Sequence, residues 1–188
     1  GNKKKNFFNI NSSIDPQSPY AVSKAAGYWL VKVFRENYNI FCCSGVLFNH
    51  ESPLRSDEFV TKKIVNGAKL IQKGKSKKLL LGDINVYRDL GWAPEYVKAY
   101  WLMLQKKIPR DLIIGSGKTH SLKDFAKEVF KLNKLSTIHI KSDVKKFKRK
   151  LDIKGYRADI SQTKKNLKWS PKTNFKQIVF KMVNDELF

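Results

Sequence analysis

The stretch SPYAVSKAAGYWLVK, residues 18–32, decides how the chain is interpreted. From Tyr20 to Tyr38 apolar residues recur at spacings of three and four, which predicts a long helix with one apolar face. Ser18 is a residue type that caps helix N-termini, and Pro19 suits the first helical position because its ring fixes φ. The stretch therefore predicts a helix that begins next to a polar, proline-containing turn.

Two Tyr-x-x-x-Lys spacings lie in this helix, Tyr20 with Lys24 and Tyr28 with Lys32. Residues four apart share one helix face, so a Lys ammonium can lie beside a phenol and lower its pKa. Such a Tyr can exchange a proton with a hydroxyl or a carbonyl. This spacing is expected by chance in a chain rich in lysine, so the position of each pair in the helix must distinguish a catalytic pair from an ordinary one. Tyr20 stands at the helix start, where a substrate can reach it, whereas Lys32 is the better candidate for an ordinary surface residue.

The rest of the chain alternates between apolar runs and helical periodicity. A nearly continuous apolar run at 39–48 predicts a buried strand of the parallel kind. Ser121 and Asp124 have the spacing of a capping box at a helix start. Further helices are expected at about 58–73, 93–106, 121–132, 159–169 and 173–188, and further strands at 78–82 and 111–115. Strands that alternate with helices favour an α/β fold.

Composition is that of a globular chain with an excess of positive charge. The 188 residues are 41% hydrophobic, and 38 Lys and Arg against 16 Asp and Glu give a net charge of +22. A surplus of this size attracts phosphates of any kind. Because the lysines are scattered, we interpret them as a solvated surface and consider nucleic acid an unlikely partner. A basic nucleic-acid-binding module is the non-enzymatic alternative, and it predicts a steep dependence of affinity on salt.

The same composition gives expectations about location and metals. Cys42 and Cys43 are adjacent in an apolar run and are interpreted as buried small hydrophobes in a reducing compartment. No apolar stretch approaches the roughly 20 residues of a membrane span, and no signal peptide is recognised. We expect a soluble cytoplasmic protein without a membrane association and without a metal site.

A glycine-containing segment, IIGSGKTHS at 113–121, is similar to the end of a phosphate-binding P-loop. That motif needs a Gly five residues before Gly117, where the backbone approaches phosphate, and this position is Leu112. We therefore interpret the segment as a tight turn between a strand and a helix. The dinucleotide fingerprint G-x-G-x-x-G is absent. If the protein uses a nicotinamide cofactor, the pyrophosphate-binding half is not in this chain.

Five motifs in order resemble the extended short-chain dehydrogenase/reductase enzymes that act as dehydratases and epimerases of nucleotide sugars: SPYAVSK, LFNHESP, FVTKKI, LGDINVYRDLGWAPEYV and NLKWSP. LFNHESPLR with FVTKKI resembles the GDP-mannose 4,6-dehydratase family more narrowly. The resemblance implies the C-terminal half of an extended Rossmann-type fold together with a small α/β substrate-binding subdomain. Residues 1–57 would belong to the Rossmann domain, and 58–188 mainly to the subdomain, interleaved with the last Rossmann elements. It also implies a possible homodimer through the helix at 20–38.

In that family an NADP-bound enzyme oxidises C4 of the mannose of GDP-mannose, eliminates water across C5 and C6, and returns the hydride to C6. The resemblance implies that Tyr20 is the base for C4 oxidation and that Lys24 lowers its pKa, both also contacting the cofactor. His50 and Arg55 would lie along NADP. Residues implied to bind the nucleotide sugar are Asn49, Lys63, Arg88, Arg149 and Asp152.

Several departures from the family pattern accompany these matches. The family's catalytic Thr and Glu and its glycine-rich cofactor segment precede the position that Gly1 matches, so we expect a truncated chain that is inactive alone. Four residues replace the family's usual Trp, His, Asp and Pro, namely Leu90, Trp92, Glu95 and Lys150. These changes leave open a related NAD(P)-dependent nucleotide-sugar epimerase or reductase as the alternative enzyme.

Overall fold

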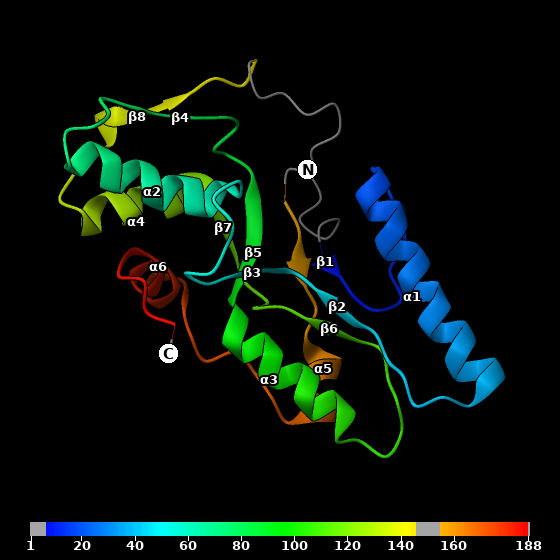
Figure 1. Cartoon of the computed structure of the whole chain (residues 1–188). Helices are drawn as coiled ribbons and strands as arrows, with labels where there is room; N and C mark the ends of the chain where they lie inside the picture. Colours follow the sequence, from blue (N-terminus) through cyan, green and yellow to red (C-terminus); the bar gives the residue numbers. More distant parts are fainter. Residues whose placement is uncertain (1–6, 146–154, 188) are drawn as a thin grey trace.

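The computed structural model describes residues 7–145 and 155–187 as a mixed α/β fold (Figure 1). The helices are α1 (Pro19–Tyr38), α2 (Val60–Gln72), α3 (Ala93–Leu104), α4 (Leu122–Leu132), α5 (Ser161–Leu167), α6 (Phe175–Val183) and the 3-10 turn η2 (Thr137–His139). The strands are β1 (Phe7–Phe8), β2 (Gly45–Leu47), β3 (Asn49–Glu51), β4 (Leu79–Leu81), β5 (Tyr87–Trp92), β6 (Leu112–Ile114), β7 (Thr119–Ser121), β8 (Ile140–Ser142) and β9 (Arg157–Ala158). The predicted α/β class is confirmed.

Short strands that are far apart in the chain pair with one another. β2 runs parallel to β6, β4 parallel to β8, and β1 parallel to β9. β5 lies between β3, which is parallel to it, and β7, which is antiparallel. Parallel partners require long connections, and the intervening helices supply them. At the carboxyl end of β3, Glu51 accepts a hydrogen bond from Thr61 in the first turn of α2.

The two larger of three buried clusters among the described residues hold the elements together. The larger one lies between helices α2, α4 and α6 and strands β4 and β5, with Ile64, Phe125 and Ile178 fully buried. These three helices group on one side of the molecule, whereas α1 stands on the other (Figure 1). A second cluster joins α3, β6 and α5 through Tyr96 and Trp169. Burial of this much aliphatic and aromatic surface supplies the main stabilisation of the fold.

Helix starts follow the predicted capping chemistry. The Ser18 hydroxyl accepts a hydrogen bond from the backbone N–H of Ala21 at 3.1 Å, so α1 begins where the sequence indicated. Ser121 and Asp124 form both bonds of a capping box at the start of α4. In each case a side chain satisfies a backbone donor that the first helical turn leaves unpaired.

The predicted strand at 39–48 is wrong for most of its length, because only the β2 residues pair as a strand. Asn39 ends α1 in the left-handed conformation, with φ of 51°. Ile40 and Phe41 are 49% and 43% exposed. The backbone carbonyl of Cys42 accepts from Arg35 instead of from a neighbouring strand. Both cysteines are half-buried, which corrects the expectation that they are core residues.

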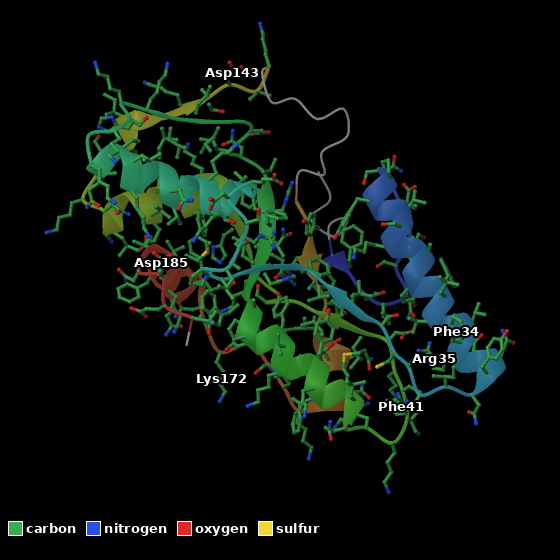
Figure 2. The ribbon with its side chains drawn as sticks, in the orientation of Figure 1. Phe34, Arg35, Phe41, Asp143, Lys172 and Asp185 are labelled. Atoms are coloured by element: carbon green, nitrogen blue, oxygen red, sulfur yellow. The ribbon has the colours of Figure 1, made fainter. Side chains whose placement is uncertain are left out.

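Arg35 docks helix α1 onto the strands. Its guanidinium donates to both carboxylate oxygens of Asp111, at 2.8 and 2.7 Å, and Asp111 also accepts from the Ser44 N–H. Burial raises the pKa of Asp111, but the Arg35 hydrogen bond, the Ser44 N–H and the Arg35 charge outweigh burial and leave that pKa below its usual value. No residue of α1 is fully buried, so this ion pair matters for its position. Figure 2 shows Arg35 at the end of α1, between the labelled Phe34 and Phe41.

His120 on β7 makes the stability of the fold pH-dependent. Its ring stacks on Phe175 of α6, with centroids 3.9 Å apart and planes 12° apart. Burial lowers the pKa of His120, and Lys118 lowers it further, while Asp124 and Asp89 oppose the shift. The unfolded chain therefore binds a proton more readily than the folded chain. We expect the free energy of unfolding to fall as pH decreases from about 6.5 through the lower folded pKa.

Urea unfolding of the chain between pH 7.5 and 5 measures this dependence. His120→Gln should flatten the profile, because it removes the group that the folded state prefers neutral. The control is His139, which is half-buried with its Nδ1 2.9 Å from the Lys77 carbonyl oxygen, and His139→Gln should leave the slope unchanged. A profile for His120→Gln that is as steep as the original would show that other groups govern stability in this range.

Candidate active site

A cavity of about 1300 Å³ lies between helix α1, the loop at 9–16 and strands β2 and β3. Small-molecule sites usually measure about 300–1,000 Å³, so this space can accommodate more than one small ligand. Five of the predicted site residues line it: Tyr20, Lys24, Asn49, His50 and Arg55. Two come from the first turns of α1, two from β3 and one from the turn after β3. The fold therefore brings together residues that are up to 35 positions apart in sequence.

Tyr20 and Lys24 lie in the first two turns of α1 and share one face of it. The Lys24 Nζ lies 5.4 Å from the centroid of the Tyr20 ring. Tyr20 is 71% exposed, so its hydroxyl is accessible from the cavity. A phenol with a neighbouring ammonium and open access to a ligand can exchange a proton with that ligand. The roles of the two residues remain predictions.

The second Tyr-x-x-x-Lys pair has a different environment. Burial raises the pKa of Tyr28, and the Asp111 carboxylate raises it further, so its phenolate form is disfavoured. Lys32 lies 5.4 Å from the Trp29 ring centroid and 3.9 Å from a Glu36 carboxylate oxygen. Tyr28 also lines the cavity, but Lys32 does not and contacts Trp29 and Glu36 instead, so this pair is the weaker acid-base candidate.

Asn49 and His50 are held on β3 by hydrogen bonds. The Asn49 side-chain oxygen accepts from the Tyr156 hydroxyl at 2.6 Å, and its backbone oxygen accepts from the Tyr96 hydroxyl at 3.4 Å. The His50 Nδ1 lies 3.2 Å from the Phe48 carbonyl oxygen. A carbonyl can only accept, so Nδ1 carries the proton, which leaves Nε2 as an acceptor in the neutral ring. Sequence reasoning did not identify Tyr156.

Arg55 is fixed beside the cavity by three neighbours. Its Nε lies 3.7 Å from a Glu51 carboxylate oxygen, Nη1 donates to the His50 carbonyl at 3.2 Å, and the guanidinium carbon lies 3.7 Å from the Phe59 ring centroid. Glu51 is 1% exposed and accepts a hydrogen bond from the Thr61 hydroxyl at 2.7 Å. Burial raises the pKa of Glu51. Such a held guanidinium is suited to bind an anionic oxygen.

The other predicted substrate residues do not line this cavity. Arg88 on β5 lies with its guanidinium carbon 5.1 Å from the Tyr156 ring centroid and donates to the Tyr87 carbonyl at 2.8 Å. Lys63 is an exposed residue of α2 and lies away from the cavity lining. Arg149 and Asp152 lie outside the described residues.

The glycine-containing turn after β6 binds a carboxylate of the protein itself. Asp89 accepts from the Ser116 N–H at 2.7 Å, the Ser116 hydroxyl at 2.6 Å and the Gly117 N–H at 2.9 Å. Gly117 has φ of 71°, which a residue with a side chain rarely adopts. The donors that a P-loop would offer to phosphate are therefore engaged by Asp89. This geometry agrees with the interpretation of the segment as a turn.

Three of the four departures from the family pattern have packing roles. Leu90 and Trp92 are each 3% exposed and belong to the larger core cluster. Glu95 accepts from the backbone N–H groups of Lys172 and Thr173, at 2.9 and 3.0 Å, and so fixes the turn before α6. Lys172 is labelled in Figure 2 beside the start of this turn. None of the three lines the cavity, whereas Lys150 lies outside the described residues.

Over the part of the chain that the structure describes, no cluster of three or more His, Cys, Asp or Glu residues is placed to hold a metal ion. No helix within residues 7–145 and 155–187 combines the length and the apolar character that crossing a membrane requires.

Comparison with solved structures identifies the fold. The structure of RMD from Pseudomonas aeruginosa complexed with NADPH matches 96% of this chain and 59% of that chain, with a TM-score of 0.85 and 20% identity. A dTDP-glucose 4,6-dehydratase from Bacillus anthracis in complex with NAD matches 96% of this chain and 56% of that chain, with a TM-score of 0.84 and 20% identity. The fold is that of the short-chain dehydrogenase/reductase-type dehydratases and epimerases of nucleotide sugars.

Sequence comparison then identifies the family. The family model described as GDP-mannose 4,6 dehydratase matches residues 1–182. GDP-mannose 4,6 dehydratase 1 of Arabidopsis thaliana is 40% identical over 173 residues, and the Dictyostelium discoideum and human enzymes are 38% and 35% identical over 190 residues. The chain belongs to the GDP-mannose 4,6 dehydratase family. These matches cover 92% of the chain but only 48%, 53% and 51% of the three relatives, so the chain spans about half of their length.

Proposed function

We propose that this chain forms the substrate-facing half of a GDP-mannose 4,6-dehydratase, a lyase that converts GDP-mannose to GDP-4-keto-6-deoxymannose. The observation that carries the proposal is the cavity in which Tyr20, Lys24, Asn49, His50 and Arg55 meet, in a chain of this family. Its named relatives are GDP-mannose dehydratases. The net charge of +22 suits a substrate that carries a diphosphate.

The residues present fit one end of a nicotinamide cofactor, which we propose to be NADP. Tyr20 and Lys24 offer a hydroxyl and an ammonium to a ribose, and His50 and Arg55 lie along the same cavity. Within residues 7–145 and 155–187, the Gly-Ser-Gly turn is engaged by Asp89 and offers no cradle for a pyrophosphate. The chemistry that such a cofactor would supply when bound is reversible hydride transfer with the sugar.

The residues of the chain would move protons and hold the substrate. Tyr20 takes the proton of the C4 hydroxyl while the C4 hydrogen leaves as hydride, and Lys24 stabilises the phenolate beforehand. The C5 proton, made acidic by the new C4 carbonyl, and the C6 hydroxyl then leave together as water. The resemblance assigns the C5 proton to a Glu outside this chain. Asn49 contacts the sugar nucleotide in this proposal, and the remaining proposed substrate contacts are Lys63, Arg88, Arg149 and Asp152.

A reconstituted enzyme tests the proposal. The chain is joined to the N-terminal half of the Arabidopsis relative, incubated with GDP-mannose and NADP, and the product is identified by NMR. GDP-4-keto-6-deoxymannose is the expected product. An epimerised or reduced sugar without loss of water would overturn the dehydratase assignment. Calorimetric titration of the 188-residue chain with NADP should show no tight binding, and tight binding would refute the view that a cofactor-binding half is needed.

We further propose that residues 1–57 belong to the Rossmann domain and that residues 58–188 belong mainly to the substrate-binding subdomain.

We also propose that two copies of the chain associate through helix α1. The half-buried residues of α1 are Ala21, Ala25, Tyr28, Val31, Lys32 and Arg35, and the first four of these line the cavity between α1 and the strands. The opposite face exposes large apolar side chains, including Val22 (53%), Trp29 (50%), Leu30 (56%), Val33 (45%) and Phe34 (45%). Such a contiguous apolar stripe favours association with another surface.

Disulfide cross-linking distinguishes a specific helix pair from nonspecific association. In a Cys42→Ser/Cys43→Ser background, single Cys substitutions are placed at Val22, Leu30 and Val33. An α1–α1 pair about a two-fold axis brings some of these positions close to their own copies, so efficient cross-linking should depend on position. Ala25→Cys, on the face toward the strands, should not cross-link. Equal cross-linking at all positions would contradict the proposed pair.

A further inference from the structure

Tyr156 lies directly behind the cavity and contacts three residues that belong to it or to the proposed substrate site. Its hydroxyl donates to the Asn49 side-chain oxygen at 2.6 Å. Its ring lies edge-on to Phe48, with centroids 5.5 Å apart and planes at 62°. The Arg88 guanidinium carbon lies 5.1 Å from the centroid of the same ring. One side chain therefore joins β5 to the segment that leads into β3.

The backbone around Tyr156 is well anchored. β9 begins at the next residue and pairs with β1. The Ala158 N–H donates to Asp89 at 3.0 Å, and the Asp159 N–H donates to the Phe8 carbonyl at 2.8 Å. Asp89 follows Arg88 on β5, so the same strand that carries the guanidinium also holds β9 in place. The ring position is consequently set by the fold and does not need a ligand.

The hydrogen bond to Tyr156 determines what Asn49 offers to the cavity. A carboxamide has one oxygen that accepts and one nitrogen that donates two hydrogen bonds. The hydrogen bond from the Tyr156 hydroxyl to the Asn49 oxygen holds the amide in one orientation, in which its N–H groups are the donors available to a ligand in the cavity. Those donors match oxygens of sugar hydroxyls or of a diphosphate. A freely rotating amide would present oxygen and nitrogen equally and would lose orientation entropy on binding.

We propose that Tyr156 is a positioning residue that fixes the Asn49 amide as a hydrogen-bond donor and supports Arg88 for binding of the nucleotide sugar. This inference rests on the proposed function. The two contacts predict separable effects: the hydroxyl acts on Asn49, and the ring acts on Arg88 through a cation–π contact. Tyr156→Phe removes only the first, whereas Tyr156→Leu removes both.

A ligand-free measurement tests the first effect. In the 15N spectrum of the chain, the side-chain NH₂ of Asn49 should have a high heteronuclear NOE, as expected for an ordered amide. Tyr156→Phe should lower this NOE toward that of an exposed Asn. Asn133 is the internal control, because its amide donates to the Val129 carbonyl at 2.8 Å far from the substitution. An unchanged Asn49 NOE would overturn the positioning role, whatever the enzyme activity.

Kinetics of the reconstituted enzyme test the consequence for substrate. Tyr156→Phe should raise the KM for GDP-mannose about five- to tenfold, the range expected for losing one hydrogen bond, with a smaller change in kcat. In an Asn49→Ala background the same substitution should have no further effect. Tyr87→Phe, at an exposed residue of β5, is the matched control. An equal loss from Tyr156→Phe with and without Asn49 would overturn the proposal. Absence of any turnover by the unsubstituted enzyme would contradict the proposed function, and the NMR result would still decide the role of Tyr156.

Discussion

Tyr20→Phe should lower kcat of the reconstituted dehydratase by about 10²- to 10⁴-fold, the range that a lost acid-base group usually costs. The substitution removes the hydroxyl that would take the proton from the C4 hydroxyl, and it leaves the ring in place. Lys24 would remain, but an ammonium cannot accept that proton. The KM for GDP-mannose should change little, because the proton transfer stabilises the transition state more than the bound substrate. Product formation followed by NMR gives both constants.

Tyr28→Phe is the matched comparison, because it lies in the same helix and in the other Tyr-x-x-x-Lys spacing. Burial and Asp111 raise the pKa of Tyr28, and Lys32 lies against Trp29 and Glu36, so this substitution should cost less than tenfold. A larger loss from Tyr28→Phe than from Tyr20→Phe would reverse the assignment of the two pairs.

Stability must be unaffected for the kinetic comparison to be meaningful. Tyr20 is 71% exposed, and exposed substitutions usually change the free energy of unfolding by less than about 0.5 kcal/mol. The melting curve of Tyr20→Phe should therefore overlap that of the unsubstituted enzyme. If a variant has a lower melting temperature, its kinetic constants would have to be compared with those of the unsubstituted enzyme at a lower assay temperature.

Helix α1 could be predicted in detail because its determinants are local. Ser18, Pro19 and the apolar periodicity lie within a few residues of the backbone groups they affect, and the structure has the predicted cap and bounds. The same holds for the capping box at Ser121 and Asp124. Local hydrogen bonds of this kind depend little on the rest of the fold.

Elements whose partners are distant in sequence were harder to predict. β5 carries Asp89, a residue type that strands disfavour, and Asp89 is nevertheless fully buried because the turn at Ser116 and Gly117 donates to it. The apolar run after α1 has the composition of a strand, yet Ile40 and Phe41 are exposed. Periodicity contains no information about such distant partners: Asp89 and Ser116 are 27 positions apart, and Ser44 and Asp111 are 67 positions apart.

The residues that line the candidate site could be predicted from motifs, but the side-chain contacts that hold them in place could not. Tyr20, Lys24, Asn49, His50 and Arg55 were identified from motifs, and the fold places all five around one cavity. Glu51, which holds Arg55, lies within LFNHESP but was not identified as a site residue, and Tyr156, which holds Asn49, belongs to no motif that we recognised. These two residues are recognised only by side-chain contacts in the folded chain. The contact between Tyr156 and Asn49 spans 107 positions of sequence.

Asp89→Ala should lower the free energy of unfolding by about 4 kcal/mol, because it removes the acceptor of four hydrogen-bond donors that belong to buried or half-buried residues. The carboxylate is 0% exposed and accepts from Ser116, Gly117 and Ala158 at 2.6–3.0 Å. Burial alone raises the pKa of Asp89, and these hydrogen bonds offset part of that shift. Each unpaired buried donor costs about 1–3 kcal/mol, and water entering the gap recovers part of it. Urea denaturation measures the change.

Asp57→Ala is the control, since Asp57 is exposed and accepts a hydrogen bond from the Asn66 side chain at 2.8 Å. It should cost about 0.5 kcal/mol or less. Asp89→Asn retains the volume but turns one acceptor into a donor that faces the N–H groups, so it should cost nearly as much as Asp89→Ala. If Asp89→Asn were neutral, the cavity left by the shorter side chain, and not the lost acceptor, would explain the effect of Asp89→Ala.

The same substitution connects the stability of the fold to the site. Asp89 holds β9 through the Ala158 N–H, and β9 sets the position of Tyr156, which in turn orders the Asn49 amide. Asp89→Ala should therefore lower the heteronuclear NOE of the Asn49 NH₂ even where the chain remains folded, below about 1 M urea. Asn133 should remain ordered under those conditions, because its acceptor lies within α4. A loss of order at both amides would indicate general unfolding, whereas a loss at Asn49 alone would show that a carboxylate outside the cavity positions a residue inside it.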